Sequence, residues 1–178
     1  MRTVTKEYTV YDYNDLLANK ELKERVLKEN WDINVTFDWW DWIIESWIEE
    51  NEENGIEFIR KSIEFDLYRY KGCKCDYEVD IDKALLNIDI LTEKEKRRIK
   101  QLIYNGVCDY DSYITDQHPL VKKMMNKLYK AIERMEGLAR NELYDRLWKE
   151  YDYLTSEESI LETIQANEYE FLEDGTIA

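Results

Sequence analysis

The stretch of sequence that decides the fold is residues 119–147, PLVKKMMNKLYKAIERMEGLARNELYDRL. Its apolar residues recur mostly every three or four positions, at Leu120, Met124, Leu128, Ile132, Met135, Leu138, Leu143 and Leu147. This spacing places them on one face of a helix, and Pro119 suits a first helical turn. We therefore expect one long helix, with Gly137 as a point where it can bend, to form the scaffold of the fold.

Shorter helices are predicted on the N-terminal side of this scaffold. Asn14 or Asp15 can cap a helix that runs to about residue 30. A second helix fits residues 38–54, where Gly55 ends it. Thr92 and Glu95 have the spacing of a capping box, which predicts a basic helix from there to Tyr104. On the C-terminal side, the same spacing of Thr155 and Glu158 predicts a short helix to about Asn167.

Strands are predicted in three places. Residues 3–13 alternate apolar and polar side chains, and residues 169–172 form a second short candidate. The β-rich runs 56–70 and 73–81, joined by Lys71-Gly72, predict a hairpin. The fold class is therefore α+β, a small antiparallel sheet of N-terminal strand, hairpin and C-terminal strand packed with about five helices. With one proline and no Ser/Gly-rich linker, residues 1–178 are expected to form a single compact domain.

The composition argues for a folded protein without a membrane span. Of its 178 residues, 44% are hydrophobic and 13% are aromatic, more than a disordered chain carries. No run approaches the roughly 20 apolar residues of a transmembrane helix, and no apolar signal core follows the first charges. We therefore expect no membrane contact and a cytoplasmic location.

The charge of the chain is strongly acidic and segregated. The formal net charge is −15, which argues against direct binding of DNA or RNA. Residues 31–59 and residues 150–178 carry nine acids each and no Lys or Arg, so these segments hold −18 and the remainder sums to +3. Two segments without a base predict a surface for a basic partner.

The first acidic segment contains FDWWDWIIESWIEENEEN at residues 37–54, with four of the six tryptophans. If the segment is helical, one row of carboxylates follows 3, 4, 4, 3 spacing: Asp38, Asp41, Glu45, Glu49 and Glu52. Such a row can stand in for the phosphates of a nucleic acid, although an ordinary amphipathic helix also explains the pattern. Trp39 and Trp42 lie off the main apolar face, where they are either exposed anchors for a partner or part of a wide buried face.

Two further groups of acids are candidates for the same chemistry. The C-terminal group surrounds Tyr153 and Phe171 and comprises Glu157, Glu158, Glu162, Glu168, Glu170, Glu173 and Asp174. The other is a predicted loop with Asp109, Asp111 and Asp116. Carboxylates and aromatic rings together can occupy a cleft that normally holds nucleic acid. The alternative is that the C-terminal aromatic rings only pack the last helix and strand onto the body.

No catalytic or metal-binding pattern stands out. Cys73, Cys75, Cys108 and His118 could supply a zinc site, but the CxC spacing is unlike that of zinc sites. The aspartates near residue 110 lack the glycine and glutamate of an EF-hand loop. No phosphate loop, GxSxG elbow or HExxH motif occurs. We expect no enzyme activity, no metal and no cofactor.

Two basic helices leave room for a secondary contact with RNA. The stretch 94–100 is rich in Lys and Arg, and the scaffold helix carries Lys122, Lys123, Lys127 and Lys130. These residues are either a phosphate-binding surface or simply solvated helix faces.

The sequence resembles a family of acidic proteins encoded by phages and prophages. The resemblance is carried by TVTKEYTVYDYNDLL at residues 3–17, the helix with paired tryptophans, IEFDLYR at residues 63–69, and YDYLTSEESILETIQANEYEFLEDGTI at residues 151–177. It extends over nearly the whole chain. The chain departs from the family after IEFDLYR, where members often carry a Gly- and Ser-rich turn and this sequence has KGCKC at residues 71–75.

The resemblance implies a counter-defence function, because the family includes inhibitors of type II CRISPR nucleases. The partner would then be a type II effector nuclease loaded with guide RNA, in the cytoplasm of an infected bacterial host. Such a nuclease has basic channels for DNA and for the guide heteroduplex. The alternatives are an acidic mimic of DNA that inhibits another defence protein, and a phage adaptor module without inhibitory activity.

Overall fold

The predicted scaffold helix is present in the computed structural model as α6 (Pro119–Leu154). It runs without interruption through Gly137 and continues seven residues beyond Leu147. Its buried side chains include Leu128, Ile132 and Leu143, all from the apolar pattern of the sequence. The structure describes residues 7–68, 72–105 and 119–178.

The chain divides into two compact units. The first comprises Met1–Trp39 with Trp148–Ala178, and the second comprises Trp40–Leu147. Residues 119–147 of α6 belong to the second unit and residues 148–154 to the first. The single domain over residues 1–178 stays a prediction.

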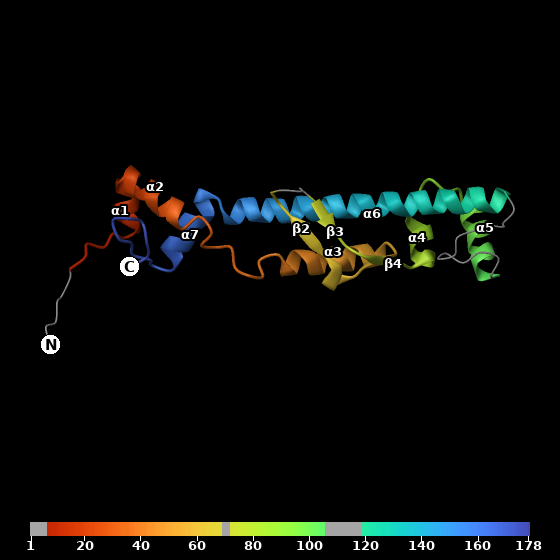
Figure 1. Ribbon diagram of the computed structural model, residues 1–178, viewed down its shortest axis with the longest axis horizontal. Helices are drawn as coiled ribbons and strands as arrows, with labels where there is room; N and C mark the ends of the chain where they lie inside the picture. Colours follow the sequence, from red (N-terminus) through yellow and green to blue (C-terminus); the bar gives the residue numbers. More distant parts are fainter. Residues whose placement is uncertain (1–6, 69–71, 106–118) are drawn as a thin grey trace. The chain divides into compact units, whose positions relative to one another are not determined.

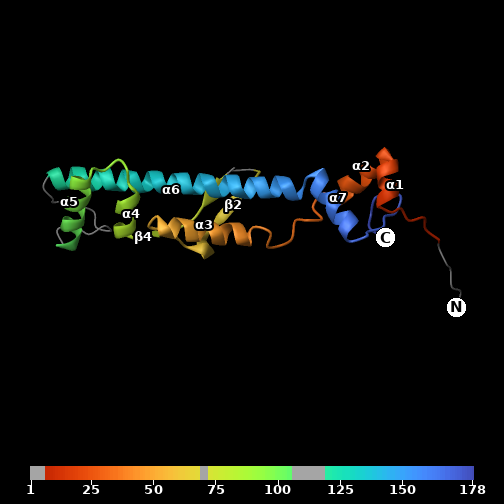
Figure 2. The ribbon, with the colours of Figure 1, turned by 180° about the vertical axis from the view of Figure 1, so that it is seen from behind.

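The first unit packs three short helices around an apolar core (Figures 1 and 2). They are α1 (Tyr13–Ala18), α2 (Lys20–Glu29) and α7 (Glu157–Ala166). The core consists of Leu16, Leu22, Val26, Ile160, Ile164 and Phe171, each at most 2% exposed. The segments at the two ends of the sequence therefore share one core.

The predicted first helix is divided in two and begins earlier than expected. Asp12, not Asn14 or Asp15, caps α1 through a reciprocal capping box with Asp15. The helix ends at Asn19, whose extended backbone also begins α2 and whose side chain accepts a hydrogen bond from the Leu22 N–H. An asparagine can act as such a cap because its short side chain competes for backbone groups.

The predicted terminal strands are reduced to single bridges. Tyr11 pairs with Phe171, and Phe171 pairs with Ile177, each as an isolated antiparallel bridge. The expected strand over residues 3–13 is wrong for the described residues 7–10, and after the bridge at Tyr11 the N-cap Asp12 begins α1 at Tyr13. The predicted cap of the last helix is also displaced by one residue, because Ser156 caps α7 while the Thr155 hydroxyl donates to the Tyr151 carbonyl of α6.

The second unit places α3 (Asp41–Glu53) alongside α6 (Figures 1 and 2). Trp47 is the main contact, since its indole N–H donates to the Ala139 carbonyl at 2.9 Å. The Trp47 ring also stacks on Phe58, with ring centroids 4.2 Å apart. The helix was predicted to begin at Asp38, but Trp40 is its N-cap and residues 37–40 form a turn.

Gly55 ends α3 as predicted and is required by its surroundings. Its backbone has φ +87°, a conformation that residues with a Cβ rarely adopt. A Cβ at this position would lie 2.7 Å from the Asp80 carbonyl oxygen. Asp80 in turn donates its N–H to the Gly55 carbonyl at 3.0 Å and caps α4 (Ile81–Asn87), a helix that was not predicted.

The predicted hairpin is present but its strands are interrupted. β1 (Ile56–Phe58) pairs with β4 (Tyr77–Val79), and β2 (Glu64–Asp66) pairs with β3 (Gly72–Lys74), both antiparallel. Between β1 and β2 lies a 3-10 turn, η1 (Arg60–Ser62). The Ser62 hydroxyl accepts from the Asp76 N–H at 2.7 Å, so a side chain replaces the strand partner there. One predicted sheet is therefore two separate two-stranded sheets.

The basic helix α5 (Glu93–Tyr104) begins at the predicted capping box of Thr92 and Glu95. Together with α4 and the first half of α6 it encloses a second core, which includes Leu85, Ile99, Leu128 and Ile132. The described residues contain seven α-helices and two small sheets, which confirms the α+β class. Among these residues, no helix combines the length and apolar character that a membrane span needs.

The capping box of α5 predicts a specific dependence of stability on pH. The Thr92 backbone N–H, helped by the Lys127 ammonium and the Thr92 hydroxyl, lowers the pKa of Glu95 to about 2. Because the folded-state pKa lies below the ordinary 4.5, the ionised group stabilises the fold above pH 4.5. This contribution is lost as the pH falls from 4.5 to about 2.

We expect Glu95→Gln to lower the unfolding midpoint at neutral pH, by an amount that shrinks over this acidic range. Urea unfolding of both proteins at a series of pH values measures the difference. A difference that keeps its neutral-pH size at the lowest pH would contradict the role of the Glu95 charge.

Candidate functional site

The candidate site is built on α3, which has one buried and one exposed face. Ile43, Ile44 and Trp47 are at most 5% exposed and fill the core side. The exposed side carries one aromatic residue and four acids at spacings of three or four residues, namely Trp42, Glu45, Glu49, Glu52 and Glu53. These five residues are called the acidic face of α3 below. Residues so spaced are neighbours on a helix surface.

The predicted row of five carboxylates is only partly brought together. Asp38 lies in the turn before α3 and accepts a hydrogen bond from the Thr36 hydroxyl, so it is not part of the helical row. Asp41 lies in the first turn, where it contacts Arg60 at 2.8 Å. Glu45, Glu49 and Glu52 share the acidic face of α3. Because α3 begins three residues later than predicted, the row of carboxylates on its surface begins later as well.

Cations from other parts of the second unit contact several of these acids. Arg60 also approaches Glu45 at 3.8 Å, and Lys83 lies 3.7 Å from Glu52. No described cation lies within 4.0 Å of Glu49 or Glu53. Cations from other elements thus offset part of the negative charge of this segment, and Glu49 and Glu53 have no ion-pair partner among the described residues.

Glu50 is the most strongly paired acid of α3. Both of its carboxylate oxygens accept from the Arg146 guanidinium, at 2.9 and 2.5 Å. Arg146 also contacts Glu142 of its own helix at 2.7 Å. The Arg146 hydrogen bonds lower the pKa of Glu50. Planar two-point pairing of this kind fixes geometry, so Glu50 serves to join α3 to α6.

The two tryptophans that were left open have opposite environments. Trp39 is 8% exposed, and its ring lies 5.7 Å from that of Tyr151. Trp42 is 60% exposed and belongs to the acidic face of α3. A large exposed aromatic side chain is typical of a binding anchor. Of the two tryptophans, only Trp42 remains a candidate anchor for a partner. Its spacing of three and seven residues from Glu45 and Glu49 could have shown from the sequence that it shares a helix face with them.

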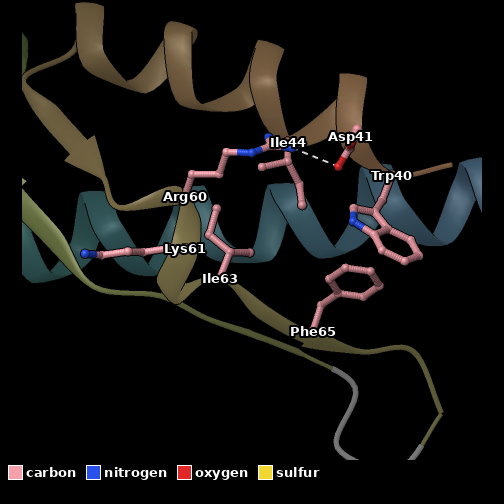
Figure 3. Close-up of a pocket in the computed structure, with 7 residues that line it drawn as sticks. All are labelled: Trp40, Asp41, Ile44, Arg60, Lys61, Ile63 and Phe65. Carbon is pink, nitrogen blue, oxygen red and sulfur yellow. Dashed lines mark hydrogen bonds and ion pairs between the residues drawn. The ribbon is translucent and has the colours of Figure 1, made fainter. Parts of the chain in front are cut away.

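A cleft of about 440 Å³ opens beside the first turn of α3. Figure 3 shows the residues that line it, which come from α3 and its N-cap, from η1 and its C-cap, and from β2. They are Trp40, Asp41, Ile44, Arg60, Lys61, Ile63 and Phe65. Trp40 and Phe65 meet edge to face, with ring centroids 5.4 Å apart. Sequence reasoning missed this cleft because the hairpin residues were not known to fold back on α3.

The cleft combines an apolar floor with a charged rim. Ile44 and Ile63 lie between the aromatic pair and Arg60, which reaches across to Asp41 (Figure 3). Since Asp41 and Glu45 both contact Arg60, the rim adjoins the acidic face of α3. The arrangement can accept an apolar side chain from a partner next to the charged face.

The acids of the C-terminal segment are all on the surface. Glu158, Glu162, Glu168, Glu170 and Glu173 are exposed, as are Glu157 and Asp174, which have contacts within the first unit. Glu157 pairs with Lys23 at 2.5 Å. Asp174 accepts from the Thr176 hydroxyl and N–H, which lower its pKa. Phe171 is fully buried, whereas Tyr153 is 53% exposed.

The other candidates receive less support from the described part of the chain. Asp109, Asp111, Asp116, Cys108 and His118 lie outside the described residues. Within residues 7–68, 72–105 and 119–178, no three His, Cys, Asp or Glu side chains are grouped to hold a metal.

The two described cysteines are not activated. Burial, together with the neighbouring Cys75, raises the pKa of Cys73 to about 12. Burial also raises the pKa of Cys75. A raised pKa favours the protonated thiol, which is a poor nucleophile.

Comparisons with family models, with curated proteins and with solved structures find no match to this chain. The interpretation of the site therefore rests on its own geometry and charge.

Proposed function

We propose that this chain is a phage-encoded, non-enzymatic inhibitor of a type II CRISPR effector nuclease loaded with guide RNA. In this proposal the acidic face of α3 occupies a basic surface of the nuclease and obstructs target-DNA binding or cleavage. The observation that carries the proposal is the exposed Trp42, at 60%, on the same helix face as the unneutralised Glu49 and Glu53.

The chemistry of this face fits a surface that normally binds nucleic acid. Arg and Lys side chains that bind phosphates also donate hydrogen bonds to carboxylates. The Trp42 indole can stack on an arginine guanidinium or fill a position where a base stacks. The neighbouring cleft, lined by Trp40 and Phe65, offers a place for an apolar side chain of the nuclease.

Other surfaces join the proposal as secondary contacts. The exposed acids of residues 157–174 extend the negative surface of the first unit. Asp109, Asp111 and Asp116 stay candidate contacts by sequence. The resemblance to acidic phage proteins supports the choice of target, and with it a site of action in the cytoplasm of the infected host.

The test is a titration of the purified protein into a DNA-cleavage reaction of guide-loaded type II nucleases, with DNA binding followed by gel shift. We expect cleavage and DNA binding to be lost together. If cleavage is lost while DNA binding stays intact, the inhibitor does not compete with DNA. It would then block the rearrangement of the nuclease that precedes cleavage. Absence of any effect across several such nucleases would contradict the proposal and favour another defence protein as target.

The adaptor alternative also has an observation in its favour. Arg60, Lys83 and Arg146 contact four of the acids of α3, which reduces its charge, while Trp42 stays exposed. An adaptor that binds mainly through Trp42 would keep its partner at high salt. An inhibitor that binds through charge would lose affinity as salt rises, because screening weakens interactions between exposed charges.

A further inference from the structure

The first half of α6 carries a basic surface that the proposed function does not use. Residues 119–132 contain four lysines and no acid. These lysines, together with Pro119 and Asn126, line an open cleft of about 450 Å³. They are Lys122, Lys123, Lys127 and Lys130, and they are called the lysine face of α6 below.

Among the described residues, three of the four ammonium groups have no ion-pair partner. Lys127 pairs at 2.9 Å with Glu95, the acid of the capping box of α5. Lys122, Lys123 and Lys130 are exposed, and no carboxylate among the described residues lies within 4.0 Å of them. The N-terminus of α6 at Pro119 adds the positive end of the helix dipole to the same region.

The net charge of −15 does not cancel this local surface. α3 contacts α6 through Trp47 and Ala139, and Lys127 precedes Ala139 by twelve residues, about 18 Å along the helix axis. In Figures 1 and 2, α5 accompanies the start of α6, α4 lies next along it, and α3 lies along its middle. The surface is basic because residues 119–132 carry four lysines and no acid, while the acids of the chain lie on other elements and on other parts of α6.

We propose that the lysine face of α6 binds the phosphate backbone of a nucleic-acid strand. Lys122, Asn126 and Lys130 follow each other at four-residue spacing, about 6 Å apart along the axis, so one helix face presents a linear track of donors. Lys123 widens the track on one side. A linear cationic groove is the usual electrostatic footprint of single-strand binding. This inference does not rest on the inhibitor proposal.

The experiment measures binding of the full chain to fluorescein-labelled poly(U) RNA, and to DNA of the matching sequence, by fluorescence polarisation over a range of salt concentrations. The test variant is Lys122→Gln/Lys123→Gln/Lys130→Gln, which leaves Lys127 and the capping box intact. The matched control is Lys28→Gln/Lys74→Gln/Lys149→Gln, which removes three other exposed lysines and changes the net charge equally.

We expect the test variant to bind about tenfold more weakly than the control at low salt. Its plot of log affinity against log salt should be shallower by about 2, since each phosphate contact to a single strand contributes about 0.7. Equal affinities for RNA and DNA would mean that the protein contacts only the phosphate backbone. Tighter binding of RNA would mean that it also contacts the 2′-hydroxyl groups. Both results support the proposal. Equal weakening in the two variants, no binding by the wild-type chain, or equally tight binding of polyglutamate would overturn it.

Discussion

Trp42→Ala is expected to weaken the affinity for the guide-loaded nuclease by about 30-fold, the size of a hot-spot loss of 2 kcal/mol. The side chain is 60% exposed in the free protein, so its truncation removes contacts with the partner and few within the fold. Trp31→Ala is the matched control, because Trp31 is 48% exposed and lies outside α3. Titration of both variants in the cleavage assay measures the effect. Equal potency of Trp42→Ala and wild type would remove Trp42 from the interface.

The carboxylates of the same face separate the inhibitor from the adaptor. Glu45→Gln/Glu49→Gln/Glu53→Gln should slow association and flatten the dependence of affinity on salt. Glu21→Gln/Glu29→Gln/Glu133→Gln removes three exposed charges elsewhere and should leave association close to wild type. If only Trp42→Ala weakens a partner complex, and that complex survives high salt, the adaptor interpretation is favoured.

Trp47→Ala is expected to lower the free energy of unfolding by about 4 kcal/mol, within the range for aromatic truncation in a core. Trp47 is fully buried, stacks on Phe58 and donates its N–H to the Ala139 carbonyl, so truncation leaves a cavity and removes a buried hydrogen bond between α3 and α6. A loss of this size is a large part of the 5–15 kcal/mol that holds a typical domain together.

Trp42→Ala is again the matched control, since it removes the same side chain from the opposite face of the same helix. We expect it to change stability by about 0.5 kcal/mol or less. Urea denaturation followed by circular dichroism measures both variants. Similar losses for the two would contradict the assignment of one buried and one exposed face to α3.

Local signals in the sequence predict much of the fold. The apolar spacing of residues 120–147 predicts α6, and the capping box of Thr92 and Glu95 predicts the start of α5, because both depend on neighbours within one or two helical turns. Some wrong predictions also have local causes, because two neighbouring residues can each cap the same helix end. Ser156 caps α7 because Thr155 bonds back to α6, and Asn19 divides one predicted helix into two.

The candidate site was harder to predict because residues distant in the sequence form ion pairs with its acids. Nothing near α3 in the sequence indicates that Arg60, Lys83 and Arg146 contact its acids. The same limitation applies to Trp39 and Trp42, whose pattern fits either burial or exposure until the packing partner, Tyr151 for Trp39, is known. Whether Glu49 and Glu53 have an ion-pair partner is likewise decided by distant residues, and no described cation lies within 4.0 Å of either.

The most direct test of the account measures the affinity of the labelled protein for a catalytically inactive, guide-loaded type II nuclease, alone and with target DNA already bound. If the acidic face of α3 occupies the DNA-binding surface, prior binding of DNA should weaken the complex at least about tenfold, as expected for competition at one site. Equal affinity for the free and the DNA-bound nuclease would contradict the account.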